Sequence, residues 1–117
     1  MRVLVCGGRD YADAAHVEGV LRFHLLEGAP NVIIEGCARG ADSLAEDFGT
    51  RWLIPVEHFP ADWDRHGKAA GPIRNRQMLD EGKPDLVIAF PGGRGTANMI
   101  EQAERAGVPV IKVEPPR

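Results

Sequence analysis

The sequence predicts an α/β fold: a Rossmann-like three-layer α/β/α sandwich with a five-stranded parallel sheet. Five short aliphatic, largely β-branched runs alternate with amphipathic helical stretches, and several of the runs end at a glycine-rich turn. Parallel strands joined by right-handed helical crossovers satisfy this alternation. A length of 117 residues with 44% hydrophobic content is that of a single globular domain. We expect one domain over residues 1–113 and a disordered tail at 114–117.

The predicted elements alternate without an internal repeat or linker. Strands are expected at 2–6, 31–36, 54–59, 85–90 and 108–113. Helices are expected at 12–27, from Ala41 to about Trp52, from Pro72 to about Gly82, and from Thr96, as N-cap, to Gly107. Residues 61–71 show no clear periodicity and are interpreted as a loop.

The charge balance argues against a general nucleic-acid binder. Fourteen Lys and Arg face 17 Asp and Glu, a net charge of −3, whereas such binders carry a strong basic excess. Any anion must therefore be bound by a local group of residues. No apolar run approaches the roughly 20 residues of a membrane span, and the N-terminal residues lack the layout of a signal peptide. We expect a cytoplasmic protein with no membrane partner.

Cysteines and histidines give no metal signature in the sequence. Cys6 and Cys37 are too few for a disulfide scaffold and lack a zinc-binding spacing, so both are expected to be buried thiols. His24 lies on the apolar stripe of the first helix and is expected in the core, while His16 and His58 have no identifiable partner. We expect neither a metal nor a cofactor.

Three glycine-rich turns follow predicted strands, and each contains an arginine. They are 7–9, 36–40 and 92–96. Glycine lets the backbone approach a phosphate, and the following helix offers free N–H donors and a partial positive charge. One such turn alone has about even odds of being only a chain reversal, but the carboxyl ends of parallel strands share one edge, so the three turns should face one cleft. The spacings match neither a dinucleotide fingerprint nor a Walker motif, which disfavours NAD binding and ATP hydrolysis.

Arginines in these turns are candidate anion ligands, because a planar guanidinium binds phosphate or carboxylate oxygens in a bidentate manner. Arg9 and Arg39 lie in glycine turns, and Arg74 belongs to a further motif. For Arg76 and Arg94 a solvated surface position is the commoner alternative, although Arg94 belongs to the third turn.

Two carboxylates and one tryptophan complete the candidates. Asp42 begins the second helix and has three open roles: orienting a ribose hydroxyl, accepting a proton, or capping the helix. Asp10 is a candidate cap for the first helix. Trp63 has the shape to stack on a base, although anchoring the loop to the core is the commoner role.

Four motifs occur in order and together resemble the SLOG superfamily, most closely its YspA/YpsA-related branch. They are Gly7-Gly8-Arg9-Asp10, Gly36-x-Ala38-Arg39-Gly40-Ala41-Asp42, Arg74-Asn75-Arg76 and Pro91-Gly92-Gly93-x-Gly95-Thr96. The resemblance covers about residues 1–113. It implies a Rossmann-like domain that binds a nucleotide or a nucleotide derivative.

Related LOG enzymes release the base from nucleoside 5′-monophosphates, and their signature is only partly present. Arg74 and Met78 match its arginine and methionine, but Met99 stands at the glutamate position of Pro-Gly-Gly-x-Gly-Thr-x-x-Glu. Glu101 lies two residues further on, which is roughly 200° around a helix. Cleavage of an N-glycosidic bond normally needs a carboxylate, so Asp42, Asp10 or Glu101 would have to supply it.

These observations lead us to expect a binder of a nucleotide or nucleotide-derived small molecule. The expected ligand-binding residues are Gly7, Gly8, Arg9, Asp10, Gly36, Arg39, Gly40, Asn75, Pro91, Gly92, Gly93, Arg94, Gly95 and Thr96. Arg74 and Asp42 are the catalytic candidates under the alternative, a LOG-like phosphoribohydrolase. A second alternative, DprA-like single-stranded DNA binding, is weakened by the net charge and by only 6% aromatic residues. The LOG resemblance and the small core favour a homo-oligomer, a dimer in the first instance.

Overall fold

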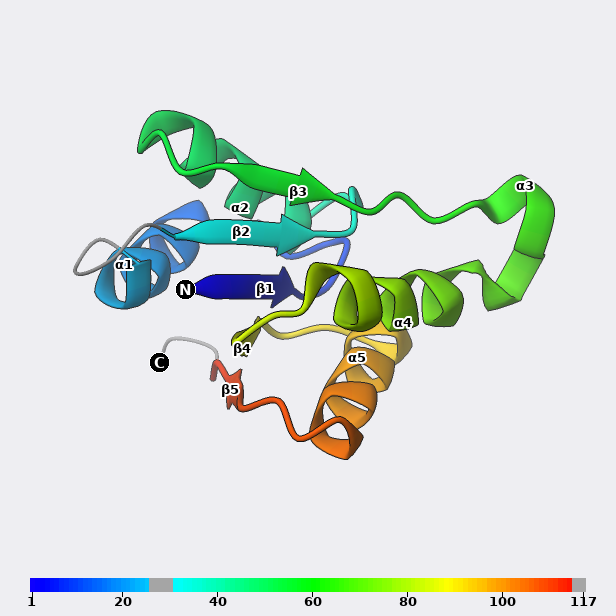
Figure 1. Ribbon diagram of the computed structural model, residues 1–117. Coiled ribbons are helices and arrows are strands. Elements are labelled where there is room, and N and C mark those ends of the chain that lie inside the picture. The colour runs from blue at the N-terminus through cyan, green and yellow to red at the C-terminus, as the bar shows by residue number, and fades with distance from the viewer. Residues whose placement is uncertain (26–30, 115–117) are drawn as a thin grey trace.

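The chain folds into one five-stranded parallel sheet covered by helices on both faces, in a computed structural model that describes residues 1–25 and 31–114 (Figure 1). The strands are β1 (Arg2–Cys6), β2 (Val32–Glu35), β3 (Val56–His58), β4 (Leu86–Ala89) and β5 (Val110–Lys112). The helices are α1 (Ala14–Leu25), α2 (Ala41–Arg51), α3 (Trp63–His66), the 3-10 turn η1 (Gly67–Ala69), α4 (Ala70–Gly82) and α5 (Arg94–Arg105). The predicted fold class is confirmed. The expected end of the first helix at 26–27 and tail residues 115–117 lie outside the described residues.

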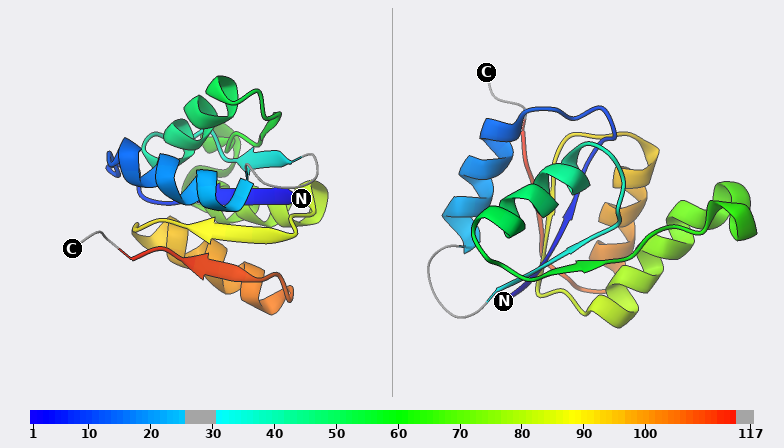
Figure 2. Two further views of the ribbon diagram at one scale, coloured as in Figure 1. Left: turned by 90° about the vertical axis from the view of Figure 1, so that its left-hand side faces the viewer. Right: turned by 90° about the horizontal axis from the view of Figure 1, so that it is seen from above.

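The strand order places the three glycine-rich turns next to one another, because they follow the neighbouring strands β2, β1 and β4. The order is β3-β2-β1-β4-β5, and every neighbouring pair is parallel. Helices α1 and α2 cover one face and α4 and α5 the other (Figure 2). The order reverses between β1 and β4, the kind of position where ligands bind in open α/β sheets. None of the helices within residues 1–25 and 31–114 is long and apolar enough to cross a membrane.

Alternation along the strands divides the core into two apolar clusters. Val3 and Val5 of β1 face α1 and α2, whereas Leu4 and Cys6 face α4 and α5. Both clusters are almost fully buried, as expected for a parallel sheet covered on both faces. His24, which was expected in the core, belongs to neither cluster; it is only partly buried and lies edge-on to the exposed ring of Phe23.

The segment interpreted as a loop is helical, so that prediction was wrong. α3 starts behind Asp62, whose side chain accepts the backbone N–H of Arg65 at 3.1 Å, and η1 leads directly into α4. A local cap, rather than an apolar stripe, therefore defines α3, and neither α3 nor η1 contains a buried residue. Without a buried face there is no hydrophobic periodicity in the sequence to detect. α3 projects from the end of the sheet at the right of Figure 1.

Two expected helix caps are also wrong. α5 starts at Arg94 behind the N-cap Gly93, so Thr96 lies within the first turn instead of preceding it. The glycine-rich turn enters the helix directly, and the Thr96 hydroxyl packs where a side chain on Gly92 would otherwise lie. α1 starts at Ala14, beyond Asp10, and it is Asp13 whose carboxylate accepts the N–H of His16 at 3.0 Å.

Candidate functional site

A cavity of about 540 Å³ lies at the carboxyl edge of the sheet, where the turns after β1 and β4 meet the starts of α4 and α5. Many of the predicted site residues line it. They are Gly7, Gly8, Arg9, Asp42, Arg74, Asn75, Gly93, Arg94, Gly95 and Thr96. The turns after β1 and β4 therefore face one cleft, as the position of their strands predicts.

A second cavity of about 320 Å³ adjoins the first. Gly36 and Arg39, from the turn after β2, line this smaller cavity. Arg9 and Arg74 line both cavities, as do Ala38 and Trp63, so these residues form the boundary between the two. The third glycine-rich turn thus contributes to the same edge of the sheet but mainly to a neighbouring compartment.

The remaining predicted ligand residues lie behind the cavity walls or away from them. Pro91 accepts the N–H of Gly8 through its carbonyl at 2.9 Å, which ties the turns after β1 and β4 together. Gly40 has a φ of 77°, and a Cβ on it would lie 2.1 Å from the Gly8 carbonyl oxygen, so only glycine fits there without strain. Gly92 packs against Gly8. Asp10 is exposed and lines neither cavity.

The N-terminus of α5 opens into the larger cavity. Its N-cap, Gly93, offers no side chain to satisfy the first helical N–H groups. The first-turn residues Arg94, Gly95 and Thr96 all line the cavity. A helix start of this kind presents N–H donors and a partial positive charge to an anion.

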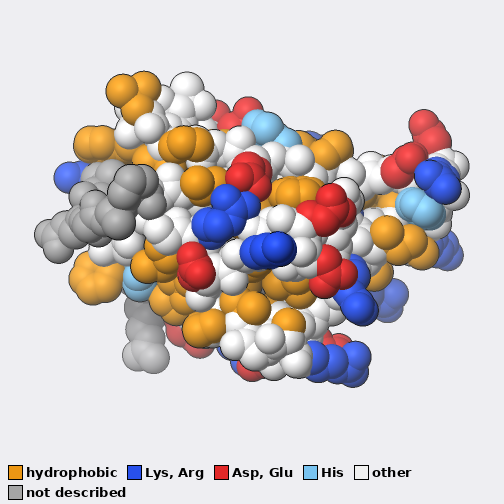
Figure 3. Space-filling model, in the orientation of Figure 1, with side chains coloured by type: hydrophobic (Ala, Val, Ile, Leu, Met, Phe, Trp, Pro, Cys, Tyr) orange, Lys and Arg blue, Asp and Glu red, His pale blue; other side chains and the backbone are white. Residues whose placement is uncertain are grey.

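Cationic side chains outnumber acidic ones around the larger cavity. Arg9, Lys68, Arg74 and Arg94 line it, against the single carboxylate of Asp42. The chain as a whole has a net charge of −3, so this excess is local. On the face shown in Figure 3, by contrast, acidic and basic side chains are interspersed.

Arg74 and Asn75 connect three elements at the cavity wall. Arg74 donates from Nη1 to the carbonyl of Gly36 at 2.6 Å and from Nε to Oδ1 of Asn75 at 3.1 Å. The buried Asn75 in turn donates to the Gly95 carbonyl at 3.2 Å and to Oδ1 of Asn98 at 3.1 Å. The guanidinium is therefore held in a fixed orientation between the end of β2 and the start of α5.

Asp42 lies in the first turn of α2 with 5% of its surface exposed. Its Oδ2 accepts the N–H groups of Gly36 at 3.1 Å and Ala38 at 3.3 Å, so it fixes the preceding turn and makes no side-chain cap of α2. The pKa of Asp42 is raised to about 6, mainly by burial and in smaller part by the nearby Glu35 carboxylate. The two N–H donors and Arg74 oppose that rise. Asp42 is thus a cavity carboxyl group that titrates near neutral pH.

The other candidate acids lie elsewhere. Met99, at the position of the LOG glutamate, is fully buried in the core between the sheet and α4 and α5. Glu101 is exposed, pairs with Arg105 on α5, and lines a separate surface hollow between α4 and α5. Of the three carboxylates considered from the sequence, only Asp42 lines the larger cavity.

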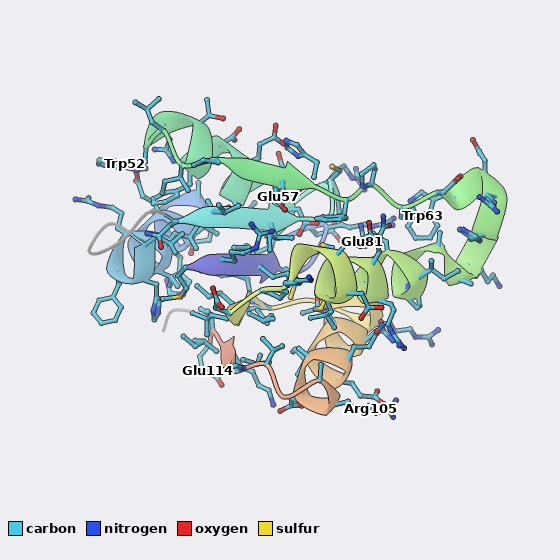
Figure 4. All side chains as sticks on the ribbon, in the orientation of Figure 1. Trp52, Glu57, Trp63, Glu81, Arg105 and Glu114 are labelled. Carbon is cyan, nitrogen blue, oxygen red and sulfur yellow. The ribbon has the colours of Figure 1, made fainter. Side chains whose placement is uncertain are left out.

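Trp63 and Lys68 extend the cavity wall from the projecting segment. The Arg9 guanidinium lies 5.2 Å from the centre of a Trp63 ring, within the range of a cation–π contact. Trp63 and Trp52 lie at opposite ends of the molecule (Figure 4). Lys68 was missed in the sequence because it belongs to no motif and the segment was interpreted as a loop. Its only signal was a cation close in sequence to Trp63.

A cluster of Glu35, Cys37 and His58 was also missed. Among the described residues these three place potential metal-ligand atoms within 4.8 Å of one another. His58, expected to have no partner, hydrogen-bonds through Nδ1 to Oε1 of Glu35, and Cys37, expected to be buried, is exposed. Residues 23 positions apart meet here because β2 and β3 pair in parallel, which no local spacing reveals. Cys6 is buried, as expected.

Comparison with known proteins assigns the family. Residues 1–66, more than half of the chain, match the model of the YspA, cpYpsA-related SLOG family. The Gene 61 protein of Mycobacterium phage D29 is 38% identical over 120 residues, covering 94% of each chain. The crystal structure of UDP-GlcNAc 2-epimerase from Neisseria meningitidis, bound to UDP-GlcNAc, has a similar fold, with a TM-score of 0.54 and 20% identity. That match covers 97% of this chain, which spans about a third (32%) of the epimerase. The chain therefore belongs to the YspA, cpYpsA-related SLOG family.

Proposed function

We propose that the chain binds a nucleotide or nucleotide-derived ligand in the larger cavity, with its phosphate at the N-terminus of α5. The observation that carries the proposal is a cationic cavity at an uncapped helix start in a chain of net negative charge. Arg9 and Arg94 supply bidentate donors, and Trp63 offers an aromatic surface for a base. The epimerase holds a nucleotide sugar, but that likeness concerns the fold alone.

The binding test compares two exposed arginines with different surroundings. Arg94→Ala removes a cation that lines the cavity, and it should weaken the binding of nucleoside monophosphates roughly 10- to 150-fold, the worth of a charge-assisted hydrogen bond. Arg76→Ala is the matched control, because Arg76 points to the surface and pairs with Asp80 at 3.0 Å. Isothermal titration calorimetry measures both affinities.

Amide signals locate the ligand. Nucleoside monophosphates at millimolar concentration should raise the melting temperature and shift the NMR signals of residues 92–96. If neither quantity changes, or if Arg76→Ala weakens binding as much as Arg94→Ala, the proposed site is wrong.

A second candidate function is phosphoribohydrolysis with Asp42 as the acid or base. Asp42 favours it, because it combines a pKa of about 6 with a place in the cavity beside Arg74. A base-release assay on purine and pyrimidine 5′-monophosphates tests it. Turnover that Asp42→Asn abolishes supports the enzyme, and in that case Arg74→Ala should lower kcat and kcat/KM together. Absence of base release from every monophosphate supports a binder.

We also propose that the chain forms a homodimer. Large apolar side chains are exposed near the ends of α1 and α2, at Phe23 and Leu53, and beside the cavity, at Trp63 and Ile73. Burying such surface between subunits stabilises small domains. Light scattering at tens of micromolar should give twice the chain mass, and the mass of a single chain would contradict the proposal. Comparing Ile73→Ser with Phe23→Ser would show which surface pairs.

A further inference from the structure

Three different metal-ligand side chains meet at the carboxyl edge of the sheet, outside the larger cavity. Glu35 ends β2, His58 ends β3, and the two are register partners in the parallel pair. Cys37 follows Glu35 by two residues in the turn after β2. The strand pairing and the turn thus bring a carboxylate, a thiol and an imidazole to one place, with their ligand atoms within 4.8 Å of one another.

The buried carboxylate is oriented toward the other two side chains. Oε2 of Glu35 accepts the backbone N–H of Cys37 at 2.6 Å, which holds this oxygen in the turn after β2. Oε1 then faces both Cys37 Sγ, at 3.6 Å, and His58 Nδ1, to which it is hydrogen-bonded. A second hydrogen bond that orients a ligating carboxylate is typical of metal sites.

The sulfur-to-oxygen distance matches a shared ion. Zinc–sulfur bonds of about 2.3 Å and zinc–oxygen bonds of about 2.0–2.2 Å at a tetrahedral angle place the two ligand atoms about 3.5–3.7 Å apart. The separation of Cys37 Sγ and Glu35 Oε1 is 3.6 Å. His58 is the adjustable member, since nearly half of its side chain is exposed on the edge strand β3.

We propose that Glu35, Cys37 and His58 bind a zinc ion through Oε1, Sγ and Nδ1. The donor set selects the class of metal: thiolate and imidazole are ligands of zinc and related transition ions, whereas magnesium and calcium take oxygen ligands. On binding, the ion replaces the hydrogen bond between Nδ1 and Oε1, and the Cys37 thiol releases its proton to solvent. No oxidation or reduction is involved.

Three protein ligands leave a fourth zinc position for water or for a ligand oxygen. Cys37 lines the smaller cavity together with Arg9, Arg39 and Arg74, so the ion would lie at the wall of a compartment that already carries three cations. An anionic group in the smaller cavity would be attracted both by these arginines and by the zinc ion. The site is separate from the N-terminus of α5, where we place the phosphate.

The experiment uses the full chain without a polyhistidine tag. Competition with a chromophoric chelator should show one zinc ion bound per chain, and cobalt substitution should produce a thiolate-to-cobalt charge-transfer band. Cys37→Ser should remove that band, and Cys37→Ser and His58→Gln should each weaken zinc binding about tenfold or more, since even outer partners of metal ligands are worth that much. Cys6→Ala and His24→Gln are the matched controls and should retain both signals.

Folding is checked separately, so the outcome stays decisive. Circular dichroism should show the wild-type spectrum for both ligand variants, because Cys37 and His58 are exposed. At the same zinc concentration, the melting temperature should rise for the wild type and the controls, and it should rise less for the ligand variants. If zinc fails to bind at hundreds of micromolar, or if Cys37→Ser and His58→Gln bind it as tightly as the wild type, the cluster is only a hydrogen-bonded end of the sheet and the proposal is overturned.

Discussion

Replacing Asp42 with asparagine should change how the stability of the protein depends on pH. The carboxyl group is buried, and its pKa is raised from 3.8 to about 6. Asparagine has nearly the same shape and keeps an oxygen to accept the N–H groups of Gly36 and Ala38. Asp42→Asn therefore removes the titration while retaining the hydrogen bonds of the turn.

The magnitude follows from linkage. A folded-state pKa above the unfolded value means that the folded chain binds more protons than the unfolded chain between about pH 4 and pH 6. The contribution of protonated Asp42 to the free energy of unfolding is thus fully present below pH 4, and it is lost as the pH rises through 6. A rise of about two units at 1.36 kcal/mol each corresponds to ~3 kcal/mol.

Urea unfolding at several values between pH 4 and pH 7 measures this term. The difference in unfolding free energy between Asp42→Asn and the wild type isolates the one group, because every other titration occurs in both proteins. As the pH rises from 4 to 7, the unfolding free energy of Asp42→Asn should increase relative to that of the wild type by ~3 kcal/mol. A difference that stays constant with pH would refute a buried, titrating Asp42.

Three further substitutions, one of them with a control, test the packing that surrounds the site. Gly40→Ala should destabilise the fold by more than ~1 kcal/mol in chemical denaturation, because the position has a positive φ and the new Cβ would lie 2.1 Å from the Gly8 carbonyl oxygen. Gly67→Ala is the control: its φ is 57° but no atom lies near the new Cβ, so it should destabilise the fold less. Asn75→Ala removes two hydrogen bonds to α5 and should cost ~1–3 kcal/mol in the same assay. Met99→Glu places a carboxylate in the core and should lower the melting temperature sharply, with the loss eased at acidic pH, because a protonated glutamate costs less to bury.

The sheet and the glycine-rich turns after β1 and β4 were predictable because their sequence signals are local. Aliphatic runs such as the one ending at Cys6, followed by glycines, specify strand and turn within ten residues. The shared edge of parallel strands then brings Gly8 and Gly93 to one cavity. No register had to be known for that step.

What sequence reasoning missed depends on contacts between distant residues or on weak local capping. Glu35 and His58 meet only through the register of β2 and β3, and that register is set by the packed core. α3 has no buried face, so no periodic stripe marks it, and the role of Lys68 in the cavity stayed hidden with it. The start of α5 was misplaced because glycine caps a helix by its backbone, while Thr96 carries the stronger capping propensity.

The absence of buried residues in α3 and η1 separates part of the cavity wall from the packing of the fold. The cavity has one wall made of tightly packed turns around Gly8 and Pro91, and another made by Trp63 and Lys68 on a segment that contributes nothing to either core. Substitutions on the first wall strain the backbone of the whole sheet edge. Substitutions on the second change the size and charge of the opening while the cores stay intact. If the cavity binds a ligand as we propose, this segment is the place where its selectivity can be changed without disturbing either core.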